Sequence, residues 1–125
     1  MPCVMCIWQR WPHAAAIVIA LLALLVLPGF LRPLAWLGAL AMAASAGLGL
    51  YHAGVEQKWW PGLSGCSGGI DPSGLSATEA LAQLRATDMV ACDEIVWDLL
   101  GLSMAGWNGL ISLGLVGLWL MAARR

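Results

Sequence analysis

Three long apolar segments constrain this chain more than any other feature of its sequence. They cover residues 14–30, 34–51 and 99–123. A helix that crosses a bilayer needs about 20 mostly apolar residues at a rise of about 1.5 Å each. Only 10% of the residues are charged, against about 25% in an average soluble domain, so the chain cannot cover a water-facing surface. We therefore expect one domain, residues 1–125, that folds as an all-α integral membrane protein with a bundle of three transmembrane helices.

The acidic residues mark the aqueous part of the protein. All seven lie between residues 56 and 98, inside the long segment 52–98. Within it, Ser76-Ala77-Thr78-Glu79 matches a helix capping box and predicts a short helix to about Ala86 that lies at the membrane surface. A further helix is expected to start near Asp93 and to run into the third span.

Three spans place residues 1–13 and the 52–98 loop on one side of the membrane. The other side carries three arginines in a short turn and a short tail, which weakly makes it the cytoplasmic side; they are Arg32, Arg124 and Arg125. All four cysteines then face the opposite side; they are Cys3, Cys6, Cys66 and Cys92. Two separated pairs of thiols can therefore meet there.

Small residues recur at four-residue spacing within two of the spans. In the second span they are Ala39, Ala43 and Gly47. In the third they are Gly101, Ala105 and Gly109. Faces of this kind let helix backbones approach closely in lipid, although ordinary alanine and glycine richness is a sufficient alternative for the second span.

The cysteines allow four kinds of chemistry. A structural zinc site usually takes two close-spaced pairs, whereas Cys66 and Cys92 are far apart in sequence. A c-type haem would need histidine where Ile7 stands. Structural disulfides would suit the loop pair but not Cys3 and Cys6, because so short a ring restrains little chain. The remaining interpretation is a relay, in which a loop disulfide exchanges with a partner thiolate and a membrane-fixed pair passes two electrons to a quinone.

Two segments resemble the disulfide bond formation protein B (DsbB) family. The first is Pro2-Cys3-Val4-Met5-Cys6-Ile7-Trp8-Gln9-Arg10-Trp11-Pro12, and the second runs from Cys92 through Trp97 and Gly101 to Trp107. The loop with one cysteine in each half also fits that family. The resemblance covers nearly the whole chain. The family has four spans with one before the Cys-x-x-Cys motif, so this chain is expected to lack the first of them.

The resemblance implies a bacterial inner-membrane enzyme whose cysteines face the periplasm. It would reoxidise a DsbA-like thioredoxin-fold oxidase and pass the electrons to ubiquinone or menaquinone. Cys66 would form the mixed disulfide with the partner, Cys92 would exchange with Cys3, and Cys6 would face the quinone. The protein is also expected to contact the lipid bilayer. No nucleic-acid partner and no resident metal are expected.

Arg10 and His52 are the expected quinone-site residues besides Cys6. The resemblance assigns Arg10 to that site. If the segment is helical, Arg10 shares a face with Cys6, where its charge would favour the thiolate and stabilise negative charge on a quinone oxygen. An ordinary juxtamembrane arginine is the alternative. His52 and Glu56 are four residues apart and are expected to handle quinone protons. The equally supported alternative is that His52 is a neutral histidine at the membrane interface, without such a role.

Two other functions stay open at this point. One is a quinone-coupled enzyme of the vitamin K epoxide reductase type, whose loop pattern matches less well. The other is a non-enzymatic membrane scaffold with structural disulfides or a bound metal.

Overall fold

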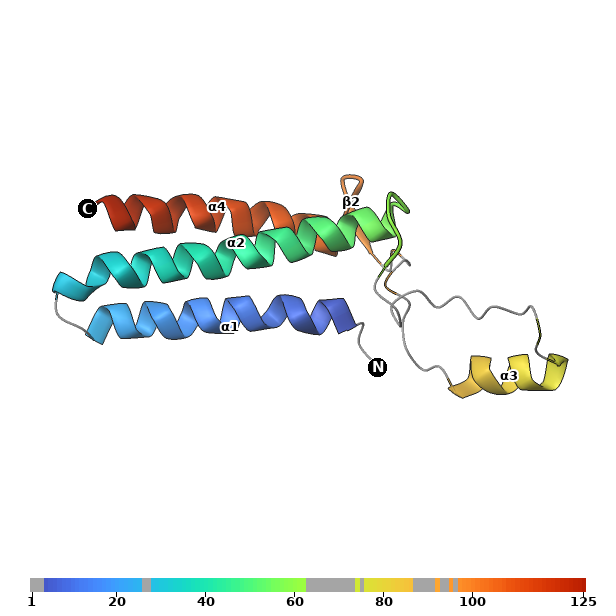
Figure 1. Cartoon of the computed structure of the whole chain (residues 1–125). Coiled ribbons are helices and arrows are strands. Elements are labelled where there is room, and N and C mark those ends of the chain that lie inside the picture. The colour runs from blue at the N-terminus through green and yellow to red at the C-terminus, as the bar shows by residue number, and fades with distance from the viewer. Residues whose placement is uncertain are drawn as a thin grey trace.

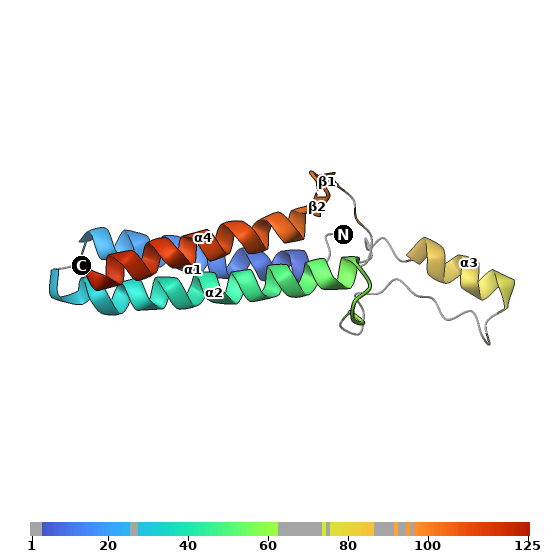
Figure 2. The same ribbon diagram turned by 90° about the horizontal axis from the view of Figure 1, so that it is seen from above.

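The three predicted spans are three long helices that pack side by side. The computed structural model describes residues 4–25, 28–62, 74, 76–86, 92, 95 and 97–125. The elements are α1 (Val4–Leu25), the short 3-10 helix η1 (Pro28–Phe30), α2 (Leu31–Glu56), α3 (Ala77–Ala86), β1 (Asp98–Leu99), β2 (Leu102–Ser103) and α4 (Met104–Arg124). Helix α2 packs against both α1 and α4 (Figure 1). Helix α3 stands apart, beyond the end of the bundle where α1 begins (Figure 2).

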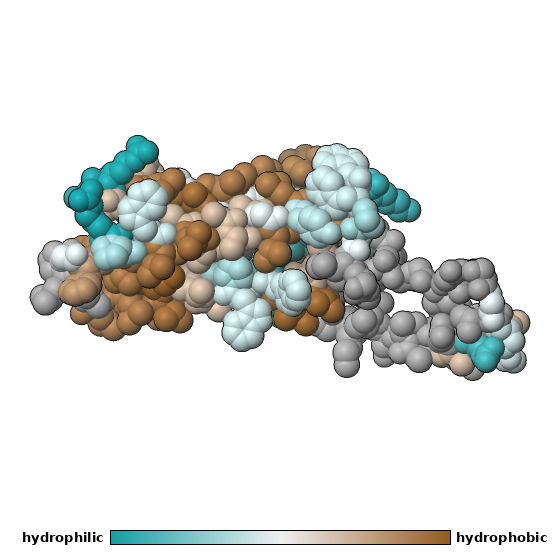
Figure 3. Space-filling model, viewed as in Figure 1, coloured by the Kyte–Doolittle hydropathy of each residue, from teal (hydrophilic) through white to brown (hydrophobic). Residues whose placement is uncertain are grey.

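The bundle turns its large apolar side chains outward and its small and polar ones inward. Leu24 and Leu25 are 82% and 83% exposed, and apolar surface covers much of the bundle in Figure 3. The buried positions include Ser45 and Ser112, both with no exposed surface. All three long helices are long and apolar enough to cross a membrane. Such an outer surface suits lipid rather than water, and the chain is an all-α integral membrane protein.

Helix α1 begins about ten residues earlier than the predicted first span. Residues 4–13, expected to form a segment outside the helix, are helical, and the helix ends at Leu25 rather than near residue 30. It passes through Pro12, which has no N–H to give to the carbonyl of Trp8. Proline is tolerated inside membrane helices, because neighbouring groups satisfy the backbone that it leaves unpaired. The Cys-x-x-Cys motif therefore leads directly into helix α1.

Helix α2 runs to Glu56, five residues beyond the predicted second span, and it starts at Leu31 rather than residue 34. A Schellman motif ends it. The N–H of Trp59 bonds the carbonyl of Gly54 at 2.9 Å, and that of Lys58 bonds the carbonyl of Val55 at 3.0 Å. Lys58 takes the left-handed conformation, with φ of 59°, that glycine usually supplies. The absence of glycine there hid this helix end from sequence reasoning.

A tight hairpin precedes α4, where the sequence predicted a continuous helix from about Asp93 and a span from residue 99. Asp98 pairs with Ser103 and Leu99 with Leu102 in antiparallel register. The two residues between them, Leu100 and Gly101, both have positive φ, as in a type I′ turn. Ser103 then caps α4 by accepting the N–H of Gly106 at 3.2 Å. Helix α4 therefore starts only at Met104.

Helices α2 and α4 meet closely at glycine. A Cβ atom on Gly49 would lie 2.7 Å from the backbone nitrogen of Gly109 and 3.0 Å from the carbonyl oxygen of Ala105. The α4 face predicted from small residues is thus correct for Ala105 and Gly109. The α2 face is not, because Ala43 and Gly47 are exposed. The helices approach through small residues on a different side of α2.

The predicted capping box starts α3. Ser76 Oγ accepts the N–H of Glu79 at 3.4 Å, and the Glu79 carboxylate accepts the Ser76 N–H at 3.0 Å and its hydroxyl at 2.6 Å. These bonds from Ser76, the hydroxyl first, hold the pKa of Glu79 below its usual range. Both reciprocal backbone contacts of the motif are present, and the helix ends at Ala86 as expected.

Candidate functional site

The predicted site residues that the structure describes lie at or near the end of the bundle where α1 begins, α2 ends and α4 begins (Figure 1); they are Cys6, Arg10, His52 and Cys92. Cys6 lies in the first turn of α1 and is exposed. Cys3 and Cys66 lie outside the described residues. The structure therefore places two of the four predicted cysteines, Cys6 on α1 and Cys92 in the segment before the hairpin.

Cys92 is buried at the start of α1. It is 2% exposed and disulfide-bonded. It packs in one cluster with Met5 and Val55, each also 2% exposed, and Tyr51 covers the cluster from α2. Met5 lies between the two cysteines of the Cys-x-x-Cys motif. A residue from the second half of the long loop is thus in contact with the motif itself.

A chain of hydrogen bonds crosses the bundle next to this cluster. The side-chain amide of Asn108 on α4 donates to Gln9 Oε1 on α1 at 2.9 Å. Gln9 Nε2 lies 2.8 Å from Nδ1 of His52 on α2. His52 is only 4% exposed. The three long helices therefore contribute one polar side chain each to a connected set inside the bundle.

Glu56 extends this set toward the end of α2. Its Oε1 lies 3.8 Å from His52 Nε2. The side chain of Glu56 is 8% exposed, and its other oxygen, Oε2, is buried without a hydrogen-bond partner among the described residues. A buried carboxylate oxygen with spare acceptor capacity is costly unless it binds a proton or another donor. The pair therefore keeps one buried acceptor oxygen, Oε2 of Glu56, that the described residues leave unused.

A second branch leads from Gln9 deeper into the bundle. His13 Nδ1 donates to the Gln9 carbonyl at 3.0 Å and lies 3.2 Å from Ser45 Oγ. The hydroxyl of Ser112 donates to Ser45 at 3.0 Å. This branch satisfies polar groups that would be expensive to leave unpaired in lipid. His13 is half-buried and bonded inward.

Arg10 lies on α1 four residues after Cys6, so the two positions share a helix face as predicted. Its side chain is exposed, and it makes no hydrogen bond or ion pair with any part of the chain that the structure describes. The guanidinium is therefore available to a ligand or to lipid head groups. Its assignment to a quinone site stays a prediction.

Aromatic side chains pack against one another at the C-terminal end of α2. Trp60 stacks on Tyr51, with ring centroids 5.8 Å apart, and its Nε1 donates to the Tyr51 carbonyl at 3.0 Å. The same indole lies against Gly54, which leaves no room for a Cβ atom. Trp60 thus holds the chain after α2 against the helix end, next to the Cys92 cluster. Trp59 is 73% exposed.

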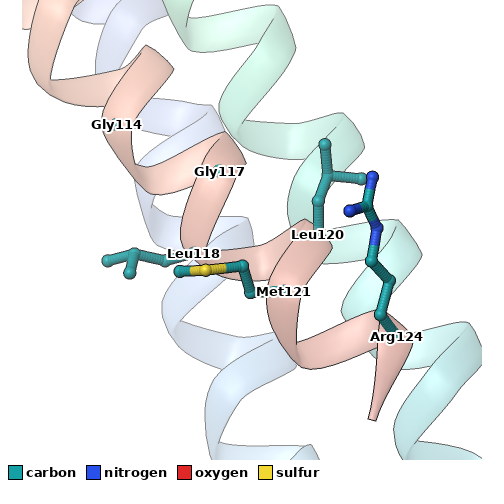
Figure 4. Close-up of a pocket in the computed structure, with 6 residues that line it drawn as sticks. All are labelled: Gly114, Gly117, Leu118, Leu120, Met121 and Arg124. Carbon is teal, nitrogen blue, oxygen red and sulfur yellow. The ribbon is translucent and has the colours of Figure 1, made fainter.

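An apolar groove of about 340 Å³ lies elsewhere, on the second half of α4. It is lined by Gly114, Gly117, Leu118, Leu120, Met121 and Arg124, drawn in Figure 4. These residues are at the opposite end of α4 from Asn108, so the groove does not belong to the cysteine site. Among the described residues, no three His, Cys, Asp or Glu side chains gather as a metal ion would need.

Sequence reasoning missed four members of the polar set: Gln9, Ser45, Asn108 and Ser112. The available signal was their isolation within apolar helices, because polar residues there usually face the bundle interior. Their pairing needed the three-dimensional packing.

The fold and the site define a helical membrane protein that carries a buried disulfide cysteine against a Cys-x-x-Cys motif. The model of the disulfide bond formation protein DsbB family matches residues 1–122. The chain belongs to this family.

Curated relatives agree with the family model. The chain is 35% identical to disulfide bond formation protein B of Azoarcus sp. (strain BH72), over 99% of this chain and 77% of that protein. It is 36% identical to the protein of the same name from Dechloromonas aromatica (strain RCB), over 92% of this chain and 70% of that one. No solved structure matches the chain significantly. The membership makes it a membrane oxidoreductase of disulfide bond formation.

Proposed function

We propose that this protein is a quinone-linked thiol–disulfide oxidoreductase of the bacterial inner membrane, with its cysteines facing the periplasm. It takes electrons from a DsbA-like thioredoxin-fold oxidase and passes them to ubiquinone or menaquinone. The observation that carries the proposal is the disulfide-bonded Cys92, buried against Met5 inside the Cys-x-x-Cys motif. A loop cysteine held against the motif is what disulfide exchange between the two pairs requires.

The reaction balances as two exchanges and one electron transfer. The partner's thiolate attacks the loop disulfide at Cys66 and leaves with a disulfide of its own, so that Cys66 and Cys92 become reduced. Cys92 then exchanges with Cys3, which restores the loop disulfide and leaves Cys3 and Cys6 as the dithiol. Reoxidation of Cys3 and Cys6 to their disulfide passes two electrons and two protons to the quinone. The net change is partner dithiol plus quinone to partner disulfide plus quinol.

The described residues fit a quinone beside Cys6. Cys6 is exposed in the first turn of α1, and the two apolar residues that follow it in sequence, Ile7 and Trp8, are 38% and 48% exposed. A quinone supplies the two-electron acceptor from within the lipid. In this proposal Arg10 stabilises negative charge on the quinone oxygen, and His52 exchanges protons with the site.

One assay tests the activity. The purified full chain in nanodiscs is mixed with ubiquinone and a reduced DsbA-like partner, and quinone absorbance is followed. We expect quinone reduction that needs the partner's thiols and disappears in Cys66→Ser and Cys6→Ser. The two variants should differ in one respect: Cys6→Ser still captures the partner as a mixed disulfide, whereas Cys66→Ser does not. Absence of thiol-dependent quinone reduction with all cysteines intact would refute the proposal.

A further inference from the structure

The hydrogen-bond chain from α4 to α2 has a defined direction. Asn108 donates through Nδ2, so the oxygen of Gln9 is the acceptor at that end. The other end of the Gln9 amide is then its NH₂ group, which faces His52 Nδ1 at 2.8 Å. An NH₂ group can only donate, so Nδ1 must accept and carries no proton.

This direction decides where the proton of a neutral His52 resides. With Nδ1 accepting, the proton is on Nε2, which is the nitrogen that faces Glu56 at 3.8 Å. Glu56 has a second, buried oxygen with no hydrogen-bond partner among the described residues. The imidazole N–H and a carboxylate with spare acceptor capacity are therefore turned toward one another.

We propose that Gln9 and Asn108 are positioning residues, which hold His52 as the Nε2–H tautomer with its proton on the Glu56 side. The role in catalysis rests on the proposed function, in which His52 exchanges protons with the acceptor site. The tautomer itself does not depend on that function. Neither Gln9 nor Asn108 touches a reacting atom in this arrangement; they act through His52.

The test reads the protonation of His52 directly. The full chain, labelled with ¹⁵N-histidine, is placed in nanodiscs without quinone or partner, and the imidazole nitrogen shifts are recorded at neutral pH. The chain has two histidines, so His13→Gln assigns the signals. We expect the His52 Nδ1 to show the shift of an unprotonated nitrogen and Nε2 that of a protonated one. The reverse assignment would overturn the proposal.

Variants test whether the amides cause this state. Asn108→Leu releases the oxygen of Gln9, so both tautomers should appear and the two His52 shifts should move toward each other. Gln9→Met removes the amide from a different helix and should do the same, which covers the case that one variant folds poorly. Unchanged His52 shifts in the folded variants would overturn the proposal.

Ser112→Ala is the matched control. Ser112 lies one turn after Asn108 on α4 and is buried, but it bonds Ser45 and not Gln9. The His52 shifts should stay as in the wild type. A change as large as in Asn108→Leu would show a general packing effect and overturn the proposal. Because no quinone or partner is present, failure here is distinct from failure of the quinone-reduction assay.

Discussion

Because Gly49 of α2 lies directly against Gly109 of α4, we predict that adding a single methyl group at Gly49 pushes the two helices apart. A Cβ on Gly49 would lie 2.7 Å from the Gly109 nitrogen and 2.9 Å from its Cα. Carbon contacts are optimal at about 3.5–4.0 Å, so the contact with the Gly109 Cα alone requires the helices to move apart by about 0.6 Å or more. Neither contact is with a flexible side chain, because both atoms belong to the helix backbone.

The expected cost follows from overpacking. Forcing an extra methyl into a well-packed interface typically costs about 1–3 kcal/mol. Against this, replacing glycine by alanine inside a helix favours the helix by about 1 kcal/mol. Gly49→Ala alone could therefore change the free energy of unfolding only slightly, and it needs a comparison that carries the same helix-propensity gain.

Gly47→Ala provides that comparison. Gly47 lies on the same helix two residues away, is exposed, and has no atom within 4 Å of a Cβ placed on it. The propensity gain is common to both variants and cancels in their difference. We expect Gly49→Ala to be less stable than Gly47→Ala by about 1–3 kcal/mol.

Reversible unfolding in mixed micelles, followed by circular dichroism, measures the difference. Gly47→Ala should be as stable as the wild type or more so. Equal stability of the two variants would refute the close approach of α2 and α4 at Gly49. The double variant adds nothing to this test, because the two positions do not share a contact.

Three further predictions concern other parts of the chain. Arg10→Gln should raise the quinone concentration needed for half-maximal rate in the quinone-reduction assay. The control Arg125→Gln removes a charge at the other end of the bundle and should leave this concentration unchanged. Equal effects of the two variants would refute a quinone role for Arg10. Because the pKa of Glu79 is lowered in the fold, its contribution to α3 is present above the ordinary glutamate range and is lost as pH falls through the lowered value. The protection of the α3 amides against hydrogen exchange, taken relative to the intrinsic exchange rate at each pH, should therefore fall at acidic pH, with this dependence absent in Glu79→Gln. Arg32 donates through Nε to the Ala123 carbonyl at 3.2 Å, so Arg32→Leu should speed exchange in the last turn of α4 by a local loss of about 1 kcal/mol; unchanged exchange would show that the bond contributes nothing.

Periodicity and composition were sufficient for the spans and for α3, because both signals are local. The apolar runs predict helices of membrane length, and the Ser76–Glu79 motif contains its own hydrogen bonds. Two of the errors, at the end of α2 and before the start of α4, lie where an unusual residue occupies a special backbone conformation. Lys58 and Leu100 both have positive φ, and neither is a residue type that predicts it. A tryptophan contact flanks each turn: Trp60 Nε1 donates to the Tyr51 carbonyl, and Trp107 Nε1 donates to the Leu99 carbonyl. A single sequence does not display these contacts.

The polar residues inside the bundle explain why sequence reasoning found His52 and Glu56 but not Gln9 and Asn108. In a soluble protein the interior is apolar, so an isolated Gln or Ser in an apolar helix is assigned to the surface. In lipid the outside is apolar, and the same residue is stable only where another helix can bond it. Gln9 and Asn108 are far apart in sequence, but each is a polar position near the end of a span on the cysteine side. Polar residues at equal depth in different spans should therefore be considered as candidate partners. Applied to this chain, that rule pairs Gln9 with Asn108 and His52, and it separates this level from the deeper one formed by His13, Ser45 and Ser112.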